Sequence, residues 1–192
     1  NWAMKNGSEK YEYYTKISDR FDINQIDYSK PVEKGALDLG FDYSFMIPAS
    51  LNMPPFVYLE NDKVVNEPTA ISEKTRAQAP YAHWIKGPIS EDFKHDEVLP
   101  KFIEKTVSNI KENAGKNHPF FIYLPLSAPH NPMLPTEPWK GKSNLNTYAD
   151  FVIMIDDLLG TIFKTIEEAG IENNTLVIFT SDNGCTPLAN FP

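Results

Sequence analysis

The sequence predicts an α/β fold with a mainly parallel sheet and helices on both faces of that sheet. Two observations carry this prediction. Short apolar runs rich in aromatic and β-branched residues occupy residues 119–126 and 175–180, and a long amphipathic helix pattern separates them. Short runs bounded by turn signals favour strands, and their lack of clean alternation is typical of strands covered on both faces. The order strand, helix, strand predicts a βαβ unit.

The helix of this unit is predicted from a 3.6-residue apolar period that lasts about five turns. The apolar positions are Tyr148, Phe151, Val152, Ile155, Leu158, Leu159, Ile162, Phe163 and Ile166. Residues 147–150 resemble a weak capping box, in which Thr147 is the cap, and Gly170 is a suitable stop. Because a helix of this length carries the chain back along the sheet, we expect the second strand to run parallel to the first.

The segment before this unit predicts a second amphipathic helix. Its apolar positions keep helical spacing and are Val98, Leu99, Phe102, Ile103, Val107, Ile110 and Ala114. Pro100 is tolerated in the first turn of such a helix, and Gly115 follows as a stop. His95, just before the helix, is assigned a structural role, and the His83-Trp84 pair is assigned to packing.

The first 95 residues predict little regular structure. A short strand is expected at residues 45–48. The runs 56–60 and 63–65 flank Asn61-Asp62, which predicts a β-hairpin excursion with a two-residue turn, because both turn residues tolerate positive φ. The remainder of this half shows no strong period and is expected to be irregular.

Composition limits the class of protein. The chain has 192 residues, of which 41% are hydrophobic and 23% are charged, as is usual for a soluble globular protein. Its net charge of −8 argues against a nucleic-acid-binding surface. No apolar run approaches the roughly 20 residues that cross a bilayer. We therefore expect no nucleic-acid partner and no membrane insertion. Because neither end resembles a natural terminus, we also expect an internal fragment of a larger protein.

Three polar side chains are expected to share one site. His130 follows the first predicted strand, and Asp182 and Asn183 follow the second. Ligands of open α/β sheets bind at the edge formed by the carboxyl ends of the strands. A carboxylate and an amide carbonyl are hard oxygen ligands that suit Ca²⁺, with Mg²⁺ as the alternative, but a complete site needs more carboxylates than these two residues supply. Away from that edge, Asp-Asn-Gly is an ordinary turn tripeptide.

The other polar groups are less specific. A histidine on a loop stiffened by Pro129 and Pro132 can act as a general acid or hydrogen-bond an anion, and the same features fit a solvent-exposed loop histidine. Asp156 and Asp157 lie in the middle of the predicted helix and are assigned structural roles. Cys185 is expected to be a buried or half-buried inert thiol.

Taken together, several motifs in the same order resemble a known family. The sequence is similar to the formylglycine-dependent sulfatases, arylsulfatase-like members of the alkaline-phosphatase superfamily. The resemblance covers residues 31–192 and is most specific over 119–184. It is carried by residues 120–124, by Ala128-Pro129-His130-Asn131-Pro132, by Asp156-Asp157 with Gly160, and by residues 174–184.

The resemblance implies a sulfuric ester hydrolase that acts on a sulfated carbohydrate or another sulfated small molecule. A formylglycine nucleophile attacks sulfur in this family, and a bound divalent cation, usually Ca²⁺, holds the sulfate oxygens. Asp182 and Asn183 match the late pair of metal ligands. His130 matches the histidine that binds the ester and protonates the leaving oxygen.

Some parts of the family pattern are absent. The nucleophile motif, the early paired aspartates and the Gly-Lys-x-x-His segment do not occur, and the later lysine would follow Pro192. Cys185-Thr186-Pro187 resembles the nucleophile motif but has Ala189 where arginine is needed. We therefore expect residues 1–192 to be part of an N-terminal catalytic domain, with loops and the hairpin in 1–95 and a helix plus the βαβ core in 96–192. Alone, this chain is expected to be inactive.

Two alternatives remain open at the level of sequence. One is a phosphodiesterase or phosphatase of the same superfamily, and the other is a non-catalytic relative that binds glycans. Family members are usually exported, so the resemblance implies a periplasmic, secreted or lysosomal location. The sequence does not indicate the oligomeric state.

Overall fold

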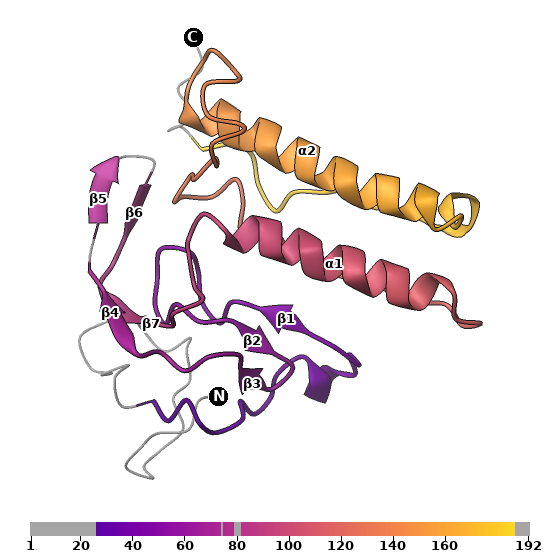
Figure 1. Ribbon diagram of the computed structural model, residues 1–192, viewed down its shortest axis with the longest axis horizontal. Coiled ribbons are helices and arrows are strands. Elements are labelled where there is room, and N and C mark those ends of the chain that lie inside the picture. The colour runs from indigo at the N-terminus through magenta and orange to yellow at the C-terminus, as the bar shows by residue number, and fades with distance from the viewer. Residues whose placement is uncertain (1–25, 74, 79–81, 187–192) are drawn as a thin grey trace. The chain divides into compact units, whose positions relative to one another are not determined.

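The computed structural model describes residues 26–73, 75–78 and 82–186 (Figure 1). Residues 1–25, for which irregular structure is expected, therefore lie outside the described residues. The chain divides into two compact units, Asn1–His95 and Asp96–Pro192.

The first unit contains a small antiparallel sheet in the order β1-β2-β3. Its strands are β1 (Phe45–Met46), β2 (Leu59–Glu60) and β3 (Lys63–Val64). The strands β2 and β3 form a hairpin in which Leu59 pairs with Val64 and Glu60 with Lys63. Asn61 takes the left-handed conformation at φ 60°, which asparagine tolerates better than most residues. Both the hairpin and the short strand expected at 45–48 are confirmed.

The core of this unit lies beneath the hairpin. Four buried side chains form one cluster, against which three half-buried ones pack: Ile26, Tyr28, Val57 and Leu59, with Val32, Met46 and Val64. β2 contributes Leu59 to this cluster, and the next residue of the strand, Glu60, is half-buried. A short 3₁₀ helix, η2 (Leu37–Leu39), lies between Val32 and β1 and ends at Gly40.

Four further strands occupy the stretch before His95. They are β4 (Ala70–Ser72), β5 (Thr75–Gln78), β6 (Ala82–Trp84) and β7 (Gly87–Ile89). β4 pairs with β7 and β5 pairs with β6, both antiparallel. The expectation that this stretch is irregular is wrong. Its strands are only three or four residues long, so backbone pairing rather than an apolar alternation defines them.

His95 is buried among aromatic rings. Its ring stacks on Trp84 at 3.9 Å between centroids and meets Phe56 at 4.6 Å and Phe93 at 5.3 Å, both edge-on. The Trp84 indole N–H donates to the Ser72 hydroxyl at 3.1 Å. These contacts fit the structural role expected for His95 and the packing role expected for Trp84.

The second unit contains two long helices, α1 (Val98–Ala114) and α2 (Thr147–Glu168), and a short 3₁₀ helix, η3 (Glu172–Asn174). α1 and α2 lie side by side and run in the same direction (Figure 1). The buried side of α1 consists of Val98, Leu99, Phe102, Ile103, Thr106 and Ile110. Both helices were predicted from their apolar period, and both are confirmed.

The ends of α2 show which capping signals act. Asn146, not Thr147, is the N-cap, and its side chain accepts a hydrogen bond from the Ala149 N–H at 3.0 Å. At the other end, Gly170 has φ 68°, its N–H donates to Glu167, and the Ile171 N–H donates to Ile166. These two bonds form a Schellman motif, which confirms Gly170 as the stop. The prediction of Thr147 as the N-cap is wrong, because the hydrogen bond is made by Asn146.

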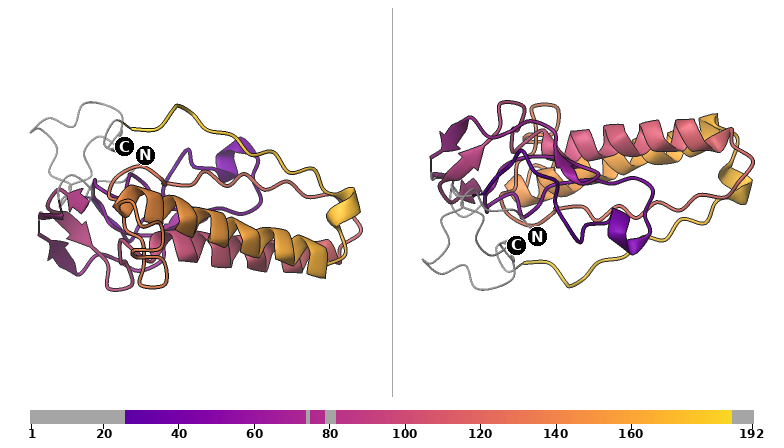
Figure 2. Two further views of the ribbon diagram at one scale, coloured as in Figure 1. Left: turned by 90° about the horizontal axis from the view of Figure 1, so that it is seen from above. Right: turned by 90° about the horizontal axis from the view of Figure 1, so that it is seen from below.

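The two apolar runs form extended segments rather than strands. Residues 119–126 and 175–180 have no strand assignment in the described part of the chain. Both segments lie on one side of the helix pair and run in the same direction, opposite to the helices (Figure 2). The strand pairs of the described residues are antiparallel, so the mainly parallel sheet is not shown. A strand needs a hydrogen-bonded neighbour, and the described residues place none beside these segments.

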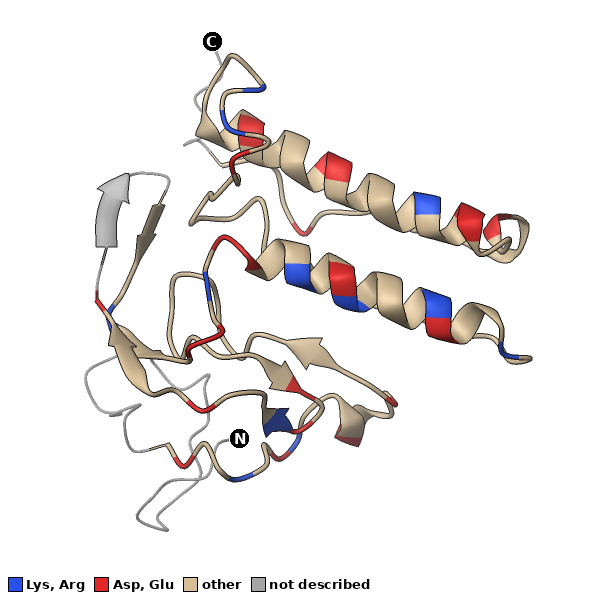
Figure 3. Ribbon diagram, viewed as in Figure 1, with Lys and Arg blue, Asp and Glu red and all other residues tan. Residues whose placement is uncertain are grey.

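Charge is distributed unevenly over the two helices (Figure 3). α1 carries three lysines and two glutamates, whereas α2 carries five carboxylates and one lysine, Lys164. Within the described residues, no helix combines the length and the apolar character that crossing a bilayer requires.

Candidate active site

His130 lies on the loop that follows the first extended segment, and its side chain is exposed. Its Nδ1 is 2.7 Å from the backbone carbonyl oxygen of Asn131. Because a carbonyl oxygen only accepts, this contact favours the tautomer in which Nδ1 carries the proton. Nε2 is then the nitrogen left to take up or donate a proton at a ligand.

The loop is anchored on the C-terminal side of His130. Pro132 and Met133 follow it and are fully buried, with Met133 at 1% exposure. The Ala128-Pro129 and Asn131-Pro132 peptide bonds are cis. Before the loop, the Ser127 hydroxyl oxygen is buried without a hydrogen-bond partner among the described residues. The imidazole is thus exposed on a backbone that buried neighbours hold in place.

Asp182 and Asn183 lie on the loop that follows the second extended segment, and both side chains are exposed. The Ser181 hydroxyl donates to the Asn183 carbonyl oxygen at 2.7 Å, which closes a tight turn. The carboxylate and the side-chain amide remain available as hard oxygen ligands, so their chemistry fits Ca²⁺ or Mg²⁺. However, the described residues contain no group of three or more histidine, cysteine, aspartate or glutamate side chains that could hold a metal.

The topology brings the two loops to one end of the second unit. Both extended segments run toward the end at which α2 begins, so the loops with His130 and with Asp182-Asn183 both follow there (Figure 2). This is the arrangement that the βαβ prediction requires of the three residues. Among the described residues, no hydrogen bond or ion pair joins His130 to Asp182 or Asn183, so the shared site remains a prediction.

Asp150 is a residue that sequence reasoning considered only as part of a weak capping box. Its carboxylate is buried and accepts three hydrogen bonds, from the Gly141 N–H at 2.8 Å, the Ser143 N–H at 2.8 Å and the Ser143 hydroxyl at 2.6 Å. Burial raises the pKa of Asp150, but the Ser143 and Gly141 hydrogen bonds outweigh it and hold the pKa below its ordinary value. The signal for this role was a short Gly-x-Ser loop ahead of an acidic first helical turn.

The same loop is fixed to α2 a second time. The Trp139 indole N–H donates to the Asp157 carboxylate at 2.5 Å, and the Lys142 ammonium lies 3.6 Å from the same oxygen. Lys142 also lies 5.9 Å above the Trp139 ring. Asp157 therefore has the structural role expected of it, as a partner for the loop that joins the His130 segment to α2.

The exposure of Cys185 differs from the prediction made from the sequence. The thiol is exposed, so the prediction of a buried or half-buried cysteine is wrong. The residues around it, 181–184, are exposed as well. Burial, followed by the negative charge that Cys185 acquires on ionisation, raises the pKa of the neighbouring Tyr148 hydroxyl.

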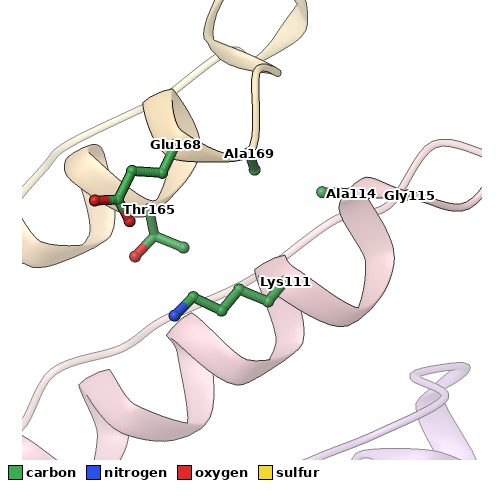
Figure 4. Close-up of a pocket in the computed structure, with 6 residues that line it drawn as sticks. All are labelled: Lys111, Ala114, Gly115, Thr165, Glu168 and Ala169. Atoms are coloured by element: carbon green, nitrogen blue, oxygen red, sulfur yellow. The ribbon is translucent and has the colours of Figure 1, made fainter.

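A shallow hollow lies between the C-terminal ends of α1 and α2 (Figure 4). It is lined by Lys111 and Ala114 of α1 with the C-cap Gly115, and by Thr165 and Glu168 of α2 with the C-cap Ala169. The Thr165 hydroxyl is satisfied within its helix by the Thr161 carbonyl at 2.8 Å. The hollow lies at the end of the helices opposite to the His130 loop and contains none of the candidate site residues.

Comparison with known proteins shows the family. The sulfatase family model matches residues 9–187. An N-acetylgalactosamine-6-O-sulfatase of Bacteroides thetaiotaomicron is 29% identical over 189 residues, which cover 82% of this chain and 37% of that protein. The human N-acetylgalactosamine-6-sulfatase is 37% identical over 83 residues, covering 43% of this chain and 16% of its own.

A solved structure gives the same result. It comes from work on glycosaminoglycan metabolism by Bacteroides thetaiotaomicron, superposes with a TM-score of 0.70 and is 26% identical. The match covers 82% of this chain and 39% of the solved chain. This chain therefore spans well under half the length of both Bacteroides relatives. The chain belongs to the sulfatase family.

Proposed function

We propose that this chain forms part of the active site of an enzyme that hydrolyses sulfate esters on a sulfated carbohydrate. The observation that carries the proposal is that the loops of His130 and of Asp182-Asn183 follow two co-directional extended segments at one end of a single unit. The relatives named as N-acetylgalactosamine-6-sulfatases support a sulfated sugar as the substrate class.

His130 acts in this proposal as the proton donor. With Nδ1 donating to the Asn131 carbonyl, a protonated imidazole directs its Nε2–H away from its own backbone. The alkoxide that leaves a sulfate ester is strongly basic, so a proton delivered at its oxygen lowers the barrier to its departure. The buried Pro132 and Met133 keep the donor in place while its ring stays open to substrate.

Asp182 and Asn183 would hold a divalent cation through one carboxylate and one amide oxygen. Ca²⁺ fits these ligands, and Mg²⁺ is the alternative. When bound, such a cation supplies Lewis-acid stabilisation of negative charge on the sulfate oxygens. Further ligands and the formylglycine nucleophile belong, in this proposal, to a part of the protein outside the 192 residues.

The extended segments support a proposal about the rest of the fold. They run in the same direction beside a helix pair that runs the opposite way, as successive strands and helices do in a mainly parallel sheet. We propose that residues 1–192 are part of the N-terminal catalytic domain of a longer, exported sulfatase. The coverage of its relatives supports this reading.

The test is sulfate release by the longer protein, with His130→Asn and Asp182→Ala as the variants. Loss of the general acid is expected to lower kcat about 100-fold or more for a poor leaving group, since positioned proton transfer contributes roughly 10²–10⁴-fold. An activated aryl sulfate should suffer much less, because its leaving group needs no proton. His118→Asn, an exposed histidine at the other end of the first extended segment, is the matched control.

The possible results distinguish a sulfatase from a phosphoryl-transfer enzyme and from a non-catalytic glycan-binding relative. Asp182→Ala is expected to lower activity strongly at the Ca²⁺ concentration that saturates the unsubstituted enzyme and to raise the Ca²⁺ concentration needed for half-maximal activity, whereas Asp156→Ala, on the exposed side of α2, should do neither. Phosphate release from a phosphate ester without sulfate release would replace the proposal with phosphoryl transfer. Binding of a sulfated glycan without turnover would indicate a non-catalytic relative. The 192-residue chain alone is expected to release no sulfate.

A further inference from the structure

The loop that precedes α2 presents a tryptophan beside the solvent-facing side of that helix. Trp139 is half-buried, and its indole N–H donates to the Asp157 carboxylate at 2.5 Å. Asp157 is exposed, whereas Phe151 and Met154 of the same helix are fully buried. The indole therefore lies outside the packed side of α2, where a half-buried aromatic ring has part of its surface open to a ligand.

The ring is held in place before any ligand binds. The Trp139 backbone N–H donates to the Thr136 carbonyl at 2.9 Å, and the Trp139 carbonyl accepts from the Lys142 N–H at 3.2 Å. The next turn is tied to the buried Asp150 carboxylate through the Gly141 N–H at 2.8 Å. Because a tryptophan side chain has few rotatable bonds, a ring fixed in this way loses little conformational entropy when a ligand binds it.

A hydrogen-bond donor and an acceptor lie beside the ring. The Lys142 ammonium lies 5.9 Å above the Trp139 ring and 3.6 Å from the Asp157 carboxylate, and about half of each charged side chain is exposed, 51% and 50%. Water competes for such exposed contacts, so they hold the ammonium weakly and it can donate to a ligand instead. Trp139 and Lys142 contact the same oxygen of Asp157, so a carboxylate with about four acceptor positions keeps some of them available.

The balance of charge indicates which ligand suits this cluster. Side chains of both signs lie on the loop before α2 (Figure 3). Lys140 pairs with Glu137 and Lys142 with Asp157, so the cluster has no excess positive charge with which to hold an isolated anion. A sugar ring instead offers an apolar face to the indole and hydroxyl groups that both donate and accept hydrogen bonds. The cluster therefore fits a saccharide ring.

We propose that Trp139, with Lys142 and Asp157, forms a surface site for one sugar ring of a long sulfated polysaccharide, apart from the candidate active site. Asp157 lies ten residues after Thr147, the first residue of α2, which is about 15 Å along the helix from the end at which the His130 loop lies. The ring that binds here is thus a different ring of the chain from the one whose ester is cleaved. The inference rests on the proposed function only for the class of ligand, a sulfated carbohydrate.

The test compares the binding of a long and a short ligand to the longer protein by isothermal titration calorimetry. Chondroitin 6-sulfate chains and 6-sulfated N-acetylgalactosamine are the probes, and the His130→Asn background prevents their consumption. Trp139→Leu is expected to weaken binding of the chains about 5-fold or more, because it removes the stacking surface, and to leave binding of the monosaccharide unchanged. Trp139→Phe keeps an aromatic ring and should retain most of the affinity for the chains.

These two variants separate a binding role from a structural one. Both lose the hydrogen bond to Asp157, so a tryptophan that served only to tether the loop would give equal losses in Trp139→Phe and Trp139→Leu. Equal losses in the two variants, or an equal loss of affinity for the monosaccharide and the chains, would overturn the proposal. Urea denaturation of each variant shows whether it folds, and the Phe variant keeps the comparison informative if the Leu variant does not.

Lys142→Ala tests the hydrogen-bond donor, and Lys164→Ala is its matched control. Each ammonium lies 3.6 Å from a carboxylate of α2, Asp157 for Lys142 and Glu168 for Lys164, and both lysines are exposed. Lys142→Ala is expected to weaken chain binding about 2- to 5-fold, and Lys164→Ala should leave it unchanged. Equal losses from the two substitutions would reduce the effect to general attraction of charge and reject the site.

Sulfate release is measured separately in the His130 background, so the two proposals can fail independently. Chains that bind through Trp139 to a protein that releases no sulfate would reject the proposed function and leave this site standing. Sulfate release together with chain binding that does not depend on Trp139 would reject the site alone. A protein that binds the chains no more tightly than the monosaccharide, or that binds neither, would also reject the site.

Discussion

The carboxylate of Asp150 holds Ser143 twice, through the hydroxyl at 2.6 Å and the backbone N–H at 2.8 Å from the same oxygen. Its second oxygen accepts from the Gly141 N–H at 2.8 Å. One buried side chain in the first turn of α2 thereby closes the loop that leads into the helix. Because that loop continues from the His130 segment, its closure also sets where α2 begins relative to the candidate site.

Replacement of this carboxylate should cost stability. Asp150→Asn replaces one acceptor oxygen by an NH₂ group. This group then faces an N–H or O–H donor of the loop, so at least one hydrogen bond is lost in a buried position. We expect a loss of about 2 kcal/mol in the free energy of unfolding, from the usual cost of an unsatisfied buried donor. Urea denaturation measures it, with Asp156→Asn on the exposed side of the same helix as control. Equal midpoints for the two variants would contradict this account.

The same carboxylate predicts an acid-sensitive stability. Its pKa in the folded protein is lowered, so its contribution is fully present above the unfolded-state pKa of about 3.9. That contribution declines as the pH falls through the folded-state pKa. Urea midpoints measured from pH 7 to pH 3 should fall more steeply in the native protein than in Asp150→Asn. Parallel curves for the two proteins would remove Asp150 from the acid response.

The N-cap of α2 predicts a smaller effect. Asn146→Ala removes the side-chain oxygen that accepts from the Ala149 N–H and should destabilise by about 1 kcal/mol. Asn146→Ser retains an acceptor at the same place and should lose much less. Thermal unfolding distinguishes them, and a loss on Thr147→Ala as large as that on Asn146→Ala would restore the cap assignment made from the sequence.

Local signals made most elements of the fold predictable. The apolar periods of α1 and α2 and the Asn61-Asp62 turn depend on residues close in sequence, and all three elements form as expected. The short strands β4 to β7 could not be predicted from the sequence, because pairing with distant residues defines them. They show no alternation of apolar and polar residues. Thr147 was taken for the cap because threonine and asparagine are both suitable, and only the geometry selects Asn146.

The candidate site was predictable only in part, because its motifs are local in sequence whereas its alignment depends on a sheet. The motifs around His130, Asp182 and Asn183 identified the family, and the topology places their loops at one end of a unit. Residues 119–126 and 175–180 have no strand assignment, since a strand needs a hydrogen-bonded neighbour and a parallel sheet needs layers on both faces. Asp150 was missed as a buried anchor because an acidic residue in a first helical turn is ordinarily explained by the helix dipole.

One glycine inside α2 and one just beyond its C-terminal end predict opposite effects of the same substitution. Gly170 has φ 68°, so Gly170→Ala forces an alanine into the left-handed region at a cost of about 1 kcal/mol, although nothing lies within 4 Å of the added Cβ. Gly160 lies inside the helix with equally open space, so Gly160→Ala should stabilise by about 0.5–1 kcal/mol through helix propensity. Urea denaturation of the two variants gives the comparison. Because the change in side chain is identical, opposite signs would assign the difference to backbone conformation, and stabilisation of both would show that α2 does not end at Gly170.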